Sequence, residues 1–199
     1  MKKIGIFGIS ADPPHASHKA IIDACLKKKL VNEVWVLPSN NHTQKKNIAS
    51  FAQRIDMCKL MFETKWSSSV KVKDFEIFNT RGTTLHMINR LEFLFKKYKF
   101  YLIVGEDCAD NIETWYSYKE LIEKYPFIVF QRGDYVSKNP KDWYLSEPHK
   151  VMSVDGCWNS STEIRKILNQ SLYNLAETMT NDKVVRYILG RCLYENSQY

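Results

Sequence analysis

Short runs of β-branched and aromatic residues alternate with longer stretches of helical periodicity about six times along this chain. Parallel strands need a crossover connection, so this alternation predicts a mostly parallel sheet with helices on both faces. The expected strands are 3–7, 33–37, 70–75, 100–104, 127–130 and 151–154, and the expected helices are 17–29, 51–65, 85–97, 118–124, 162–168 and 182–193. We therefore expect a Rossmann-like, doubly wound α/β fold that binds ligands beyond the carboxyl ends of its strands.

The length and composition of the chain fit one globular domain. It has 199 residues, and 44% of them are hydrophobic, which is enough to fill one sizeable core. No linker divides the sequence, so we expect a single domain over 1–199. The polar segment 134–149, which contains Pro140 and Pro148, is interpreted as a loop or an insertion.

Positive charge exceeds negative charge along the chain. The formal net charge is +7, which favours an anionic partner: nucleic acid, a membrane surface or a phosphorylated small molecule. No stretch approaches the roughly 18 consecutive apolar residues of a membrane span, so we expect no membrane partner. The lack of a recognisable RNA-binding module argues against nucleic acid and leaves a phosphorylated metabolite as the expected partner.

The five cysteines form no recognisable framework. They are odd in number, widely scattered and without a CxxC spacing. This pattern argues against both a disulfide scaffold and a zinc site. We therefore expect a cytoplasmic location and no metal bound by protein ligands.

Two histidines stand where the first expected strand gives way to a helix. The strand runs into Gly8, and the loop after it ends in His15-Ala16-Ser17-His18. Histidines at this spacing can face the same way at a helix start, where free N–H groups and the helix dipole favour a phosphate. Imidazole donors there would stabilise charge on a leaving pyrophosphate. The alternative is that one histidine caps the helix and the other is a surface residue.

A second candidate anion site follows the last expected strand. The run 160–165 begins with the S-x-x-E spacing of a capping box. Ser161, Thr162 and Arg165 then fall in the first helical turn, where two hydroxyls and a planar guanidinium can hold phosphate oxygens. An ordinary capped helix is the alternative for this run taken alone.

Further short motifs accompany these two sites in a fixed order. They are Gly5-Ile6-Phe7-Gly8 with Asp12-Pro13-Pro14-His15-Ala16-Ser17-His18, Pro38-Ser39 with Lys45 and Arg54, Gly105-Glu106-Asp107, Asn111, Trp115-Tyr116, Gln131-Arg132-Gly133, Ser160-Ser161-Thr162-Glu163-Ile164-Arg165, and Val185 with Tyr187-Ile188 and Leu193-Tyr194. Together they resemble the nicotinate and nicotinamide mononucleotide adenylyltransferases of the HxGH-type nucleotidyltransferase superfamily. The resemblance covers nearly the whole chain.

The resemblance implies a set of residues that handle ATP. It implies that His15 and His18 contact the ATP phosphates, with His18 the better candidate for stabilising the transition state. Lys45 resembles a basic loop residue that reaches the phosphates, a role for which Lys46 is the alternative. Arg165 matches the family's element that grips the triphosphate. The other ATP-binding positions that it implies are Gly8, Ser10, Gly105, Asp107, Ser161 and Thr162.

The acceptor positions implied by the resemblance are Thr84, Trp115, which would stack on a pyridine ring, and Arg132. Trp115 also has a structural alternative, which is packing at a helix start. The chain departs from the family's usual pattern at Ile9 and Ser17, which replace glycines, and at Ala11, which replaces a phenylalanine. The sequence leaves open whether these residues reduce or redirect activity. The stretch 79–89 also differs from the usual substrate loop.

The reaction implied by the resemblance is adenylyl transfer from ATP to nicotinate mononucleotide, forming deamido-NAD and pyrophosphate. Mg²⁺ would be bound mainly through the ATP phosphates. One alternative is adenylyl or cytidylyl transfer to another phosphorylated acceptor, such as phosphopantetheine, and another is a non-catalytic nucleotide-binding sensor. The sequence does not decide the oligomeric state, a homo-oligomer included.

Overall fold

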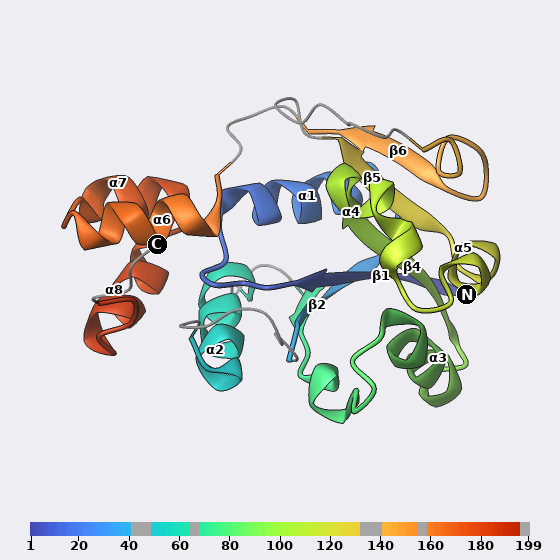
Figure 1. The fold of residues 1–199 in the computed structure, drawn as a ribbon, viewed down its shortest axis with the longest axis horizontal. Helices are drawn as coiled ribbons and strands as arrows, with labels where there is room; N and C mark the ends of the chain where they lie inside the picture. The colour runs from blue at the N-terminus through green and yellow to red at the C-terminus, as the bar shows by residue number, and fades with distance from the viewer. Residues whose placement is uncertain (41–48, 64–67, 132–140, 155–158, 196–199) are drawn as a thin grey trace.

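The structure is a computed structural model that describes residues 1–40, 49–63, 68–131, 141–154 and 159–195. Its centre is a six-stranded parallel sheet in the order β3-β2-β1-β4-β5-β6. The strands are β1 (Lys2–Ile9), β2 (Glu33–Pro38), β3 (Val70–Val72), β4 (Tyr98–Gly105), β5 (Phe127–Gln131) and β6 (Lys150–Ser153). The sheet confirms the predicted doubly wound α/β architecture (Figure 1).

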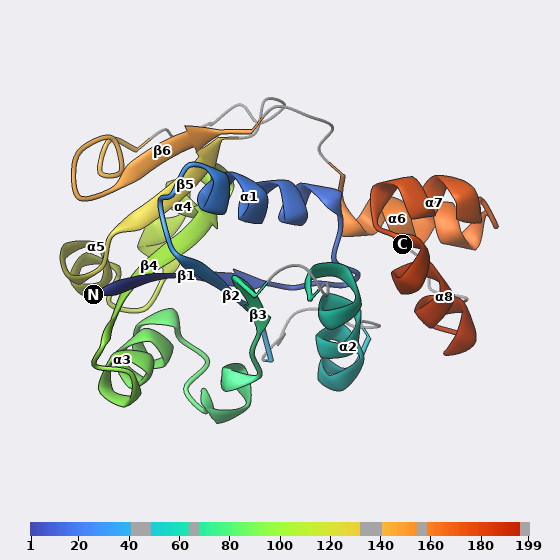
Figure 2. The same ribbon diagram turned by 180° about the vertical axis from the view of Figure 1, so that it is seen from behind.

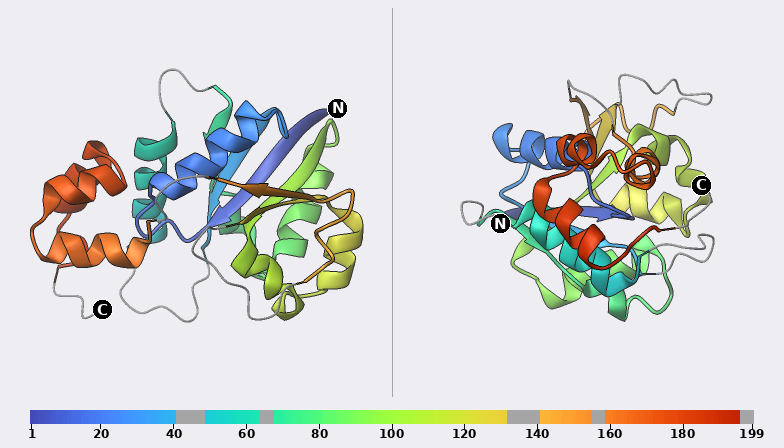
Figure 3. Two further views of the ribbon diagram at one scale, coloured as in Figure 1. Left: turned by 90° about the horizontal axis from the view of Figure 1, so that it is seen from above. Right: turned by 90° about the vertical axis from the view of Figure 1, so that its left-hand side faces the viewer.

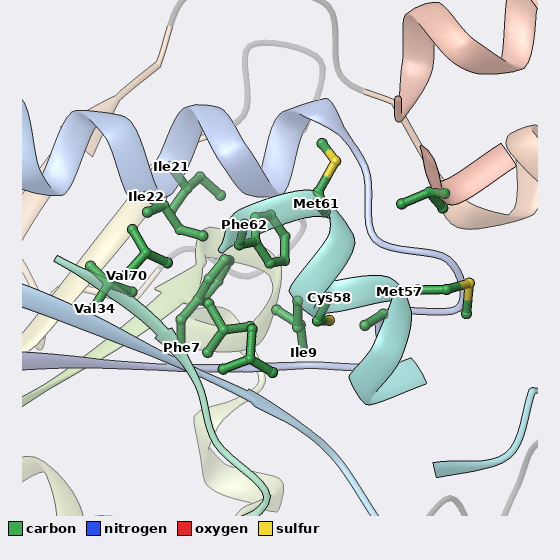
Figure 4. Close-up of a cluster of buried hydrophobic side chains, with 14 of the residues drawn as sticks. Phe7, Ile9, Ile21, Ile22, Val34, Met57, Cys58, Met61, Phe62 and Val70 are labelled. Carbon is green, nitrogen blue, oxygen red and sulfur yellow. The ribbon is translucent and has the colours of Figure 1, made fainter. Parts of the chain in front are cut away.

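Helices cover both faces of this sheet. Along β1 the side chains alternate between two cores, with Phe7 and Ile9 in one and Ile4 and Ile6 in the other. The first core includes α1 (Ala16–Lys27) and α2 (Phe51–Phe62), which Figure 4 shows closing over the sheet. The second core lies under α3 (Thr84–Leu94), η1 (Phe75–Phe78), α4 (Glu106–Asp110), η2 (Ile112–Thr114) and α5 (Tyr118–Lys124).

Three C-terminal helices form a separate group beyond one end of the sheet. They are α6 (Ser161–Asn169), α7 (Tyr173–Met179) and α8 (Asp182–Gly190). Figures 1 and 2 place this group at the carboxyl end of β1, away from the N-terminus, and Figure 3 shows it across that end. The group is joined to α2, because Asn181 Nδ2 donates to Leu60 O at 3.3 Å and Tyr187 OH donates to Asp56 Oδ2 at 2.8 Å.

Several local predictions needed correction, among them the helices expected to reach 97 and 193, which end at Leu94 and Gly190. The strand expected over 70–75 ends at Val72, and the helical turn η1 follows. Helix α4 was missed because its five residues are too few to show a helical period. Helix α7 was also missed, because its seven residues are too few to show a clear helical period.

The described part of segment 134–149 forms turns that pack on the second core. Tyr144 is buried, and Trp143 meets the Phe127 ring edge-on with the ring centroids 4.9 Å apart. Trp143 Nε1 also donates to Ala109 O at 3.2 Å, so both the ring and the N–H group of this indole have structural roles. Among the described helices, none is long and apolar enough to cross a membrane.

A buried carboxylate joins the starts of three neighbouring strands. Glu33 accepts from Lys2 Nζ at 2.6 Å and from Trp35 Nε1 at 2.5 Å, and it pairs with Lys71 Nζ at 2.8 Å. Burial alone would raise the pKa of Glu33, but these three hydrogen bonds outweigh it, and the pKa is lowered from 4.5. The charged form of Glu33 therefore stabilises the folded state.

We expect the Glu33→Gln variant to have a lower free energy of unfolding than the wild type at pH 7. Because the folded-state pKa is lowered, this stabilisation is present above about 4.5 and is lost as pH falls through the lowered value. Urea titrations at several pH values should show that the difference in free energy of unfolding between the wild type and the variant becomes smaller as the pH is lowered. The control is Glu147→Gln, which removes an exposed carboxylate paired with Lys150 and should change stability little. A difference in free energy of unfolding that stays constant down to acidic pH would contradict the stabilising role of the charged Glu33 side chain.

Candidate active site

The loop between β1 and α1 is held by side chains from distant parts of the chain. Pro13 and Pro14 lack N–H groups, so the loop cannot continue a regular hydrogen-bond pattern. Four of its carbonyl oxygens accept from outside the loop: Ser10 O from Arg54 Nη1 at 2.8 Å, Asp12 O from Arg165 Nη1 at 2.6 Å, Pro13 O from Ser161 Oγ at 2.9 Å, and Pro14 O from Thr180 Oγ1 at 2.8 Å. Helices α2 and α6 and the end of α7 thereby fix the entry to α1.

Asp12 is the buried centre of this arrangement. Its Oδ1 accepts from Ala49 N at 3.0 Å and from Tyr194 OH at 2.8 Å, and its Oδ2 lies 3.5 Å from Arg165 Nη1. A carboxylate that is only 2% exposed needs such partners to offset its desolvation. The Asp12 side chain is therefore committed to holding the loop.

Both predicted histidines lie at the start of α1. His15 is the N-cap residue, and its backbone N–H donates to His18 Nδ1 at 3.2 Å. The two rings are stacked with their centroids 3.6 Å apart, and the Phe7 ring meets His18 edge-on. Because His18 Nδ1 accepts a hydrogen bond, its ring proton lies on Nε2. His18 thus combines a capping role with an oriented N–H donor.

The second predicted anion site lies at the start of α6, beside the first. Ser160 is the N-cap, and its Oγ accepts from Glu163 N at 3.1 Å, as the S-x-x-E spacing predicted. Arg165 Nη2 donates to Thr162 Oγ1 at 3.1 Å, and the Arg165 side chain is only 12% exposed. With Ser161 and Arg165 both bonded to the β1–α1 loop, the structure brings the two helix starts together.

A cavity of about 240 Å³ opens at the carboxyl edge of the sheet. Gly8 and Ser10 line it from the end of β1, and Thr84 and Trp115 line it from α3 and the end of η2. A side-chain carbon at Gly8 would meet nothing within 4 Å, so the backbone there is open to close approach by a ligand. The structure therefore brings two of the predicted ATP positions and two of the predicted acceptor positions to one cavity.

Gly105 and Asp107 lie at the end of β4, where α4 begins. Gly105 is the N-cap of α4, and a Cβ atom there would fall 2.4 Å from Asp107 Oδ1. Only a glycine lets the carboxylate fold back so closely over the backbone. Val104, the residue before this turn, lines the cavity, whereas Gly105 and Asp107 stand outside its lining.

Sequence reasoning missed several residues of the cavity wall, and two of them carry buried polar groups. Glu76 and Asn79 lie beside Thr84 and Trp115, and burial raises the pKa of Glu76 although Asn79 Nδ2 donates to it at 3.0 Å. Asn79 Oδ1 is buried without a hydrogen-bond partner among the described residues. The available signal was the position of Asn79 at the start of the altered 79–89 stretch.

Two predicted residues, Lys45 and Arg132, lie outside the described residues. Among the residues that the structure does describe, no group of three or more His, Cys, Asp or Glu side chains could hold a metal ion. The side chains predicted to act at the two helix starts carry imidazole, hydroxyl and guanidinium groups, which suit phosphate oxygens.

Residues 6–167 match the cytidylyltransferase-like family model. A probable nicotinate-nucleotide adenylyltransferase from Fusobacterium nucleatum is 32% identical, with the alignment covering 84% of this chain and 89% of that protein. A relative of the same name from Acholeplasma laidlawii is 31% identical over 96% of both chains. The chain belongs to the nicotinate-nucleotide adenylyltransferase family.

A solved structure of this family has the same fold. The Plasmodium falciparum nicotinic acid mononucleotide adenylyltransferase complexed with NaAD matches with a TM-score of 0.84 over 98% of both chains. The sequence identity is 23%, so this likeness concerns the fold. It extends over the parallel sheet and the C-terminal helices alike.

The three departures from the usual adenylyltransferase pattern have structural explanations. Ile9 is buried in the first core, and Ala11 is fully buried with a positive φ of 55°. Ser17 is buried and its Oγ accepts from Asn159 N at 2.8 Å. All three side chains thus serve local packing or hydrogen bonding within the fold.

Proposed function

We propose that this chain transfers the adenylyl group of ATP to nicotinate mononucleotide, forming deamido-NAD and pyrophosphate. The observation that carries the proposal is the cavity at the carboxyl edge, whose wall combines Gly8 and Ser10 with Thr84 and Trp115. Membership of the nicotinate-nucleotide adenylyltransferase family supports the same reaction. The net charge of +7 suits a site that must hold two anionic substrates together.

The reaction is a direct in-line displacement at the α-phosphorus of ATP. A phosphate oxygen of the mononucleotide forms a bond to that phosphorus as the bond to the pyrophosphate oxygen breaks. No protein nucleophile takes part, so the chain contributes positioning and charge stabilisation. In this scheme His18 Nε2–H, Lys45 and Arg165 stabilise charge on the leaving pyrophosphate.

The remaining site residues have binding roles in this proposal. His15 would contact the ATP phosphates beside His18, and its backbone N–H, which donates to His18 Nδ1, orders the start of α1. The residues that would contact ATP are Gly8, Ser10, Gly105, Asp107, Ser161 and Thr162, and those that would contact the mononucleotide are Thr84, Trp115 and Arg132. Trp115 is half-buried in the cavity wall, which leaves part of its ring for stacking.

We assign Mg²⁺ to the ATP phosphates in this proposal. When bound, the ion neutralises phosphate charge. The buried carboxylate of Asp12 accepts from Ala49 N and Tyr194 OH and lies 3.5 Å from Arg165 Nη1, so we do not assign the ion to it. Substrate oxygens and waters are then the expected ligands, as is usual for this hard cation.

The described cysteines support a reducing, cytoplasmic location. Cys25, Cys58, Cys108 and Cys192 are all free thiols. Two of them, Cys25 and Cys58, are buried in the first core. Disulfides are rare in reducing compartments, so this state agrees with a cytoplasmic enzyme.

The test is pyrophosphate release from ATP with a panel of acceptors: nicotinate mononucleotide, nicotinamide mononucleotide, phosphopantetheine and a sugar phosphate. We expect the highest kcat/KM with nicotinate mononucleotide. A preference for nicotinamide mononucleotide would overturn the proposed acceptor assignment, but it would still be consistent with adenylyl transfer. ATP binding without turnover on any acceptor would instead favour a non-catalytic nucleotide sensor.

Trp115→Ala should weaken binding of the mononucleotide by about 1–3 kcal/mol and leave ATP affinity nearly unchanged, because an aromatic platform for the pyridine ring is lost. Calorimetric titration with each substrate measures both affinities. Trp143→Ala is the control, since that indole packs on Phe127 and should lower stability without singling out one substrate. Equal losses for both substrates at Trp115 would assign it a packing role.

A further inference from the structure

Ser17 makes a hydrogen bond that a glycine at this position could not make. It is the second residue of α1 and only 5% exposed. Its Oγ accepts from Asn159 N at 2.8 Å and lies 3.5 Å from Asn159 O, to which it donates. These two residues are 142 positions apart in the sequence, so the bond joins the start of α1 to a distant segment.

Asn159 belongs structurally to the C-terminal helices. It directly precedes Ser160, the N-cap of α6, and its Nδ2 donates to Met179 O at the end of α7, at 3.2 Å. A bond from Ser17 to the backbone of Asn159 therefore constrains where α6 begins relative to α1. The neighbouring bonds from Ser161 to Pro13 O and from Thr180 to Pro14 O attach to the loop before α1.

We propose that Ser17 is a positioning residue that fixes the spacing between the two helix starts that hold the ATP triphosphate. This inference rests on the proposed function, because it assigns ATP phosphates to both starts. The favourable field and free N–H groups of a helix act only within its first turn. A small displacement of α6 relative to α1 would therefore weaken the contacts that His18 and Arg165 make together with one triphosphate.

The experiment measures ATP binding by calorimetry, without acceptor, for the wild type, Ser17→Ala and Ser17→Gly. Both variants lose the hydroxyl, and we expect each to raise the Kd for ATP about three- to tenfold. The Kd for the mononucleotide should not change. Tyr125→Phe is the matched control: it deletes another buried hydroxyl, which lies within hydrogen-bonding distance of Asn89 Oδ1 and Glu92 Oε2, and should not affect ATP binding.

Each other result of this experiment has a definite meaning. Unchanged ATP affinity in both Ser17 variants, with or without a lower Tm, would overturn the inference. Weaker binding in only one of the two variants would also overturn it, because both lack the hydroxyl and another property of the residue would then matter. Failure of the wild type to bind ATP would reject the proposed function itself, which separates the two failures.

Discussion

His18→Ala is expected to lower turnover about 100-fold or more while the protein stays folded, because the imidazole acts on charge that develops in the transition state. In the structure, His18 Nδ1 accepts from His15 N, so the proton on Nε2 is directed by the fold. The measurement is kcat at saturating ATP and mononucleotide. Lys19→Ala, on the same helix but exposed and paired with Asp23, should leave kcat unchanged.

His18→Asn separates the two roles of this histidine. The asparagine Oδ1 can replace Nδ1 as the acceptor of His15 N–H, whereas nothing replaces the Nε2 donor. We therefore expect His18→Asn to keep the helix start and to lose activity as severely as His18→Ala. Wild-type turnover in His18→Asn would show that His18 serves only as a cap.

Substituting Arg165 is the second change that we expect to lower activity strongly. Its Nη1 donates to Asp12 O at 2.6 Å and its Nη2 donates to Thr162 Oγ1 at 3.1 Å, a divergent pair of bonds that one ammonium cannot reproduce. We expect Arg165→Lys to lower kcat/KM for ATP by at least about tenfold. Arg186→Lys is the control, since Arg186 is exposed and paired with Asp182 on α8.

Arg165→Ala should also destabilise the protein, by about 1–3 kcal/mol. It removes the arginine that lies 3.5 Å from the buried Asp12 carboxylate, leaving Arg54 as the nearby cation, and it removes the donor to Asp12 O. Chemical denaturation measures this loss directly. If Arg165→Lys lowered stability but left the kinetics with ATP unchanged, Arg165 would be a support of the loop rather than a ligand of ATP.

Local patterns in the sequence predicted most of the regular structure. The helix 118–124 was predicted with the bounds that the structure gives, and the strand starts at 33, 70 and 127 were also correct. In these segments the hydrophobic residues recur with a regular period, or that period changes abruptly at the start of the segment. Both signals depend only on neighbouring residues in the sequence. The boundaries failed where a strand continued into a helical turn, as at Val72, because apolar residues occur in both.

The candidate site was only partly visible in sequence. The paired histidines and the S-x-x-E run were recognised because each is a short pattern at a helix start. Glu76 and Asn79 were missed because nothing in their spacing marks them, and they reach the cavity only through the path of η1. Likewise, Thr84 and Trp115 come from separate segments that the fold brings to one wall.

By itself, the sequence predicted most of the elements, their parallel arrangement, two candidate anion sites at helix starts and the resemblance to a family. Only the tertiary structure decided that α6 and the end of α7 hold the β1–α1 loop, through Arg165, Ser161 and Thr180. The reason is physical: these side chains bond to backbone carbonyls, which every residue possesses. A sequence can therefore mark the donors, but only the folded chain shows which carbonyls they reach.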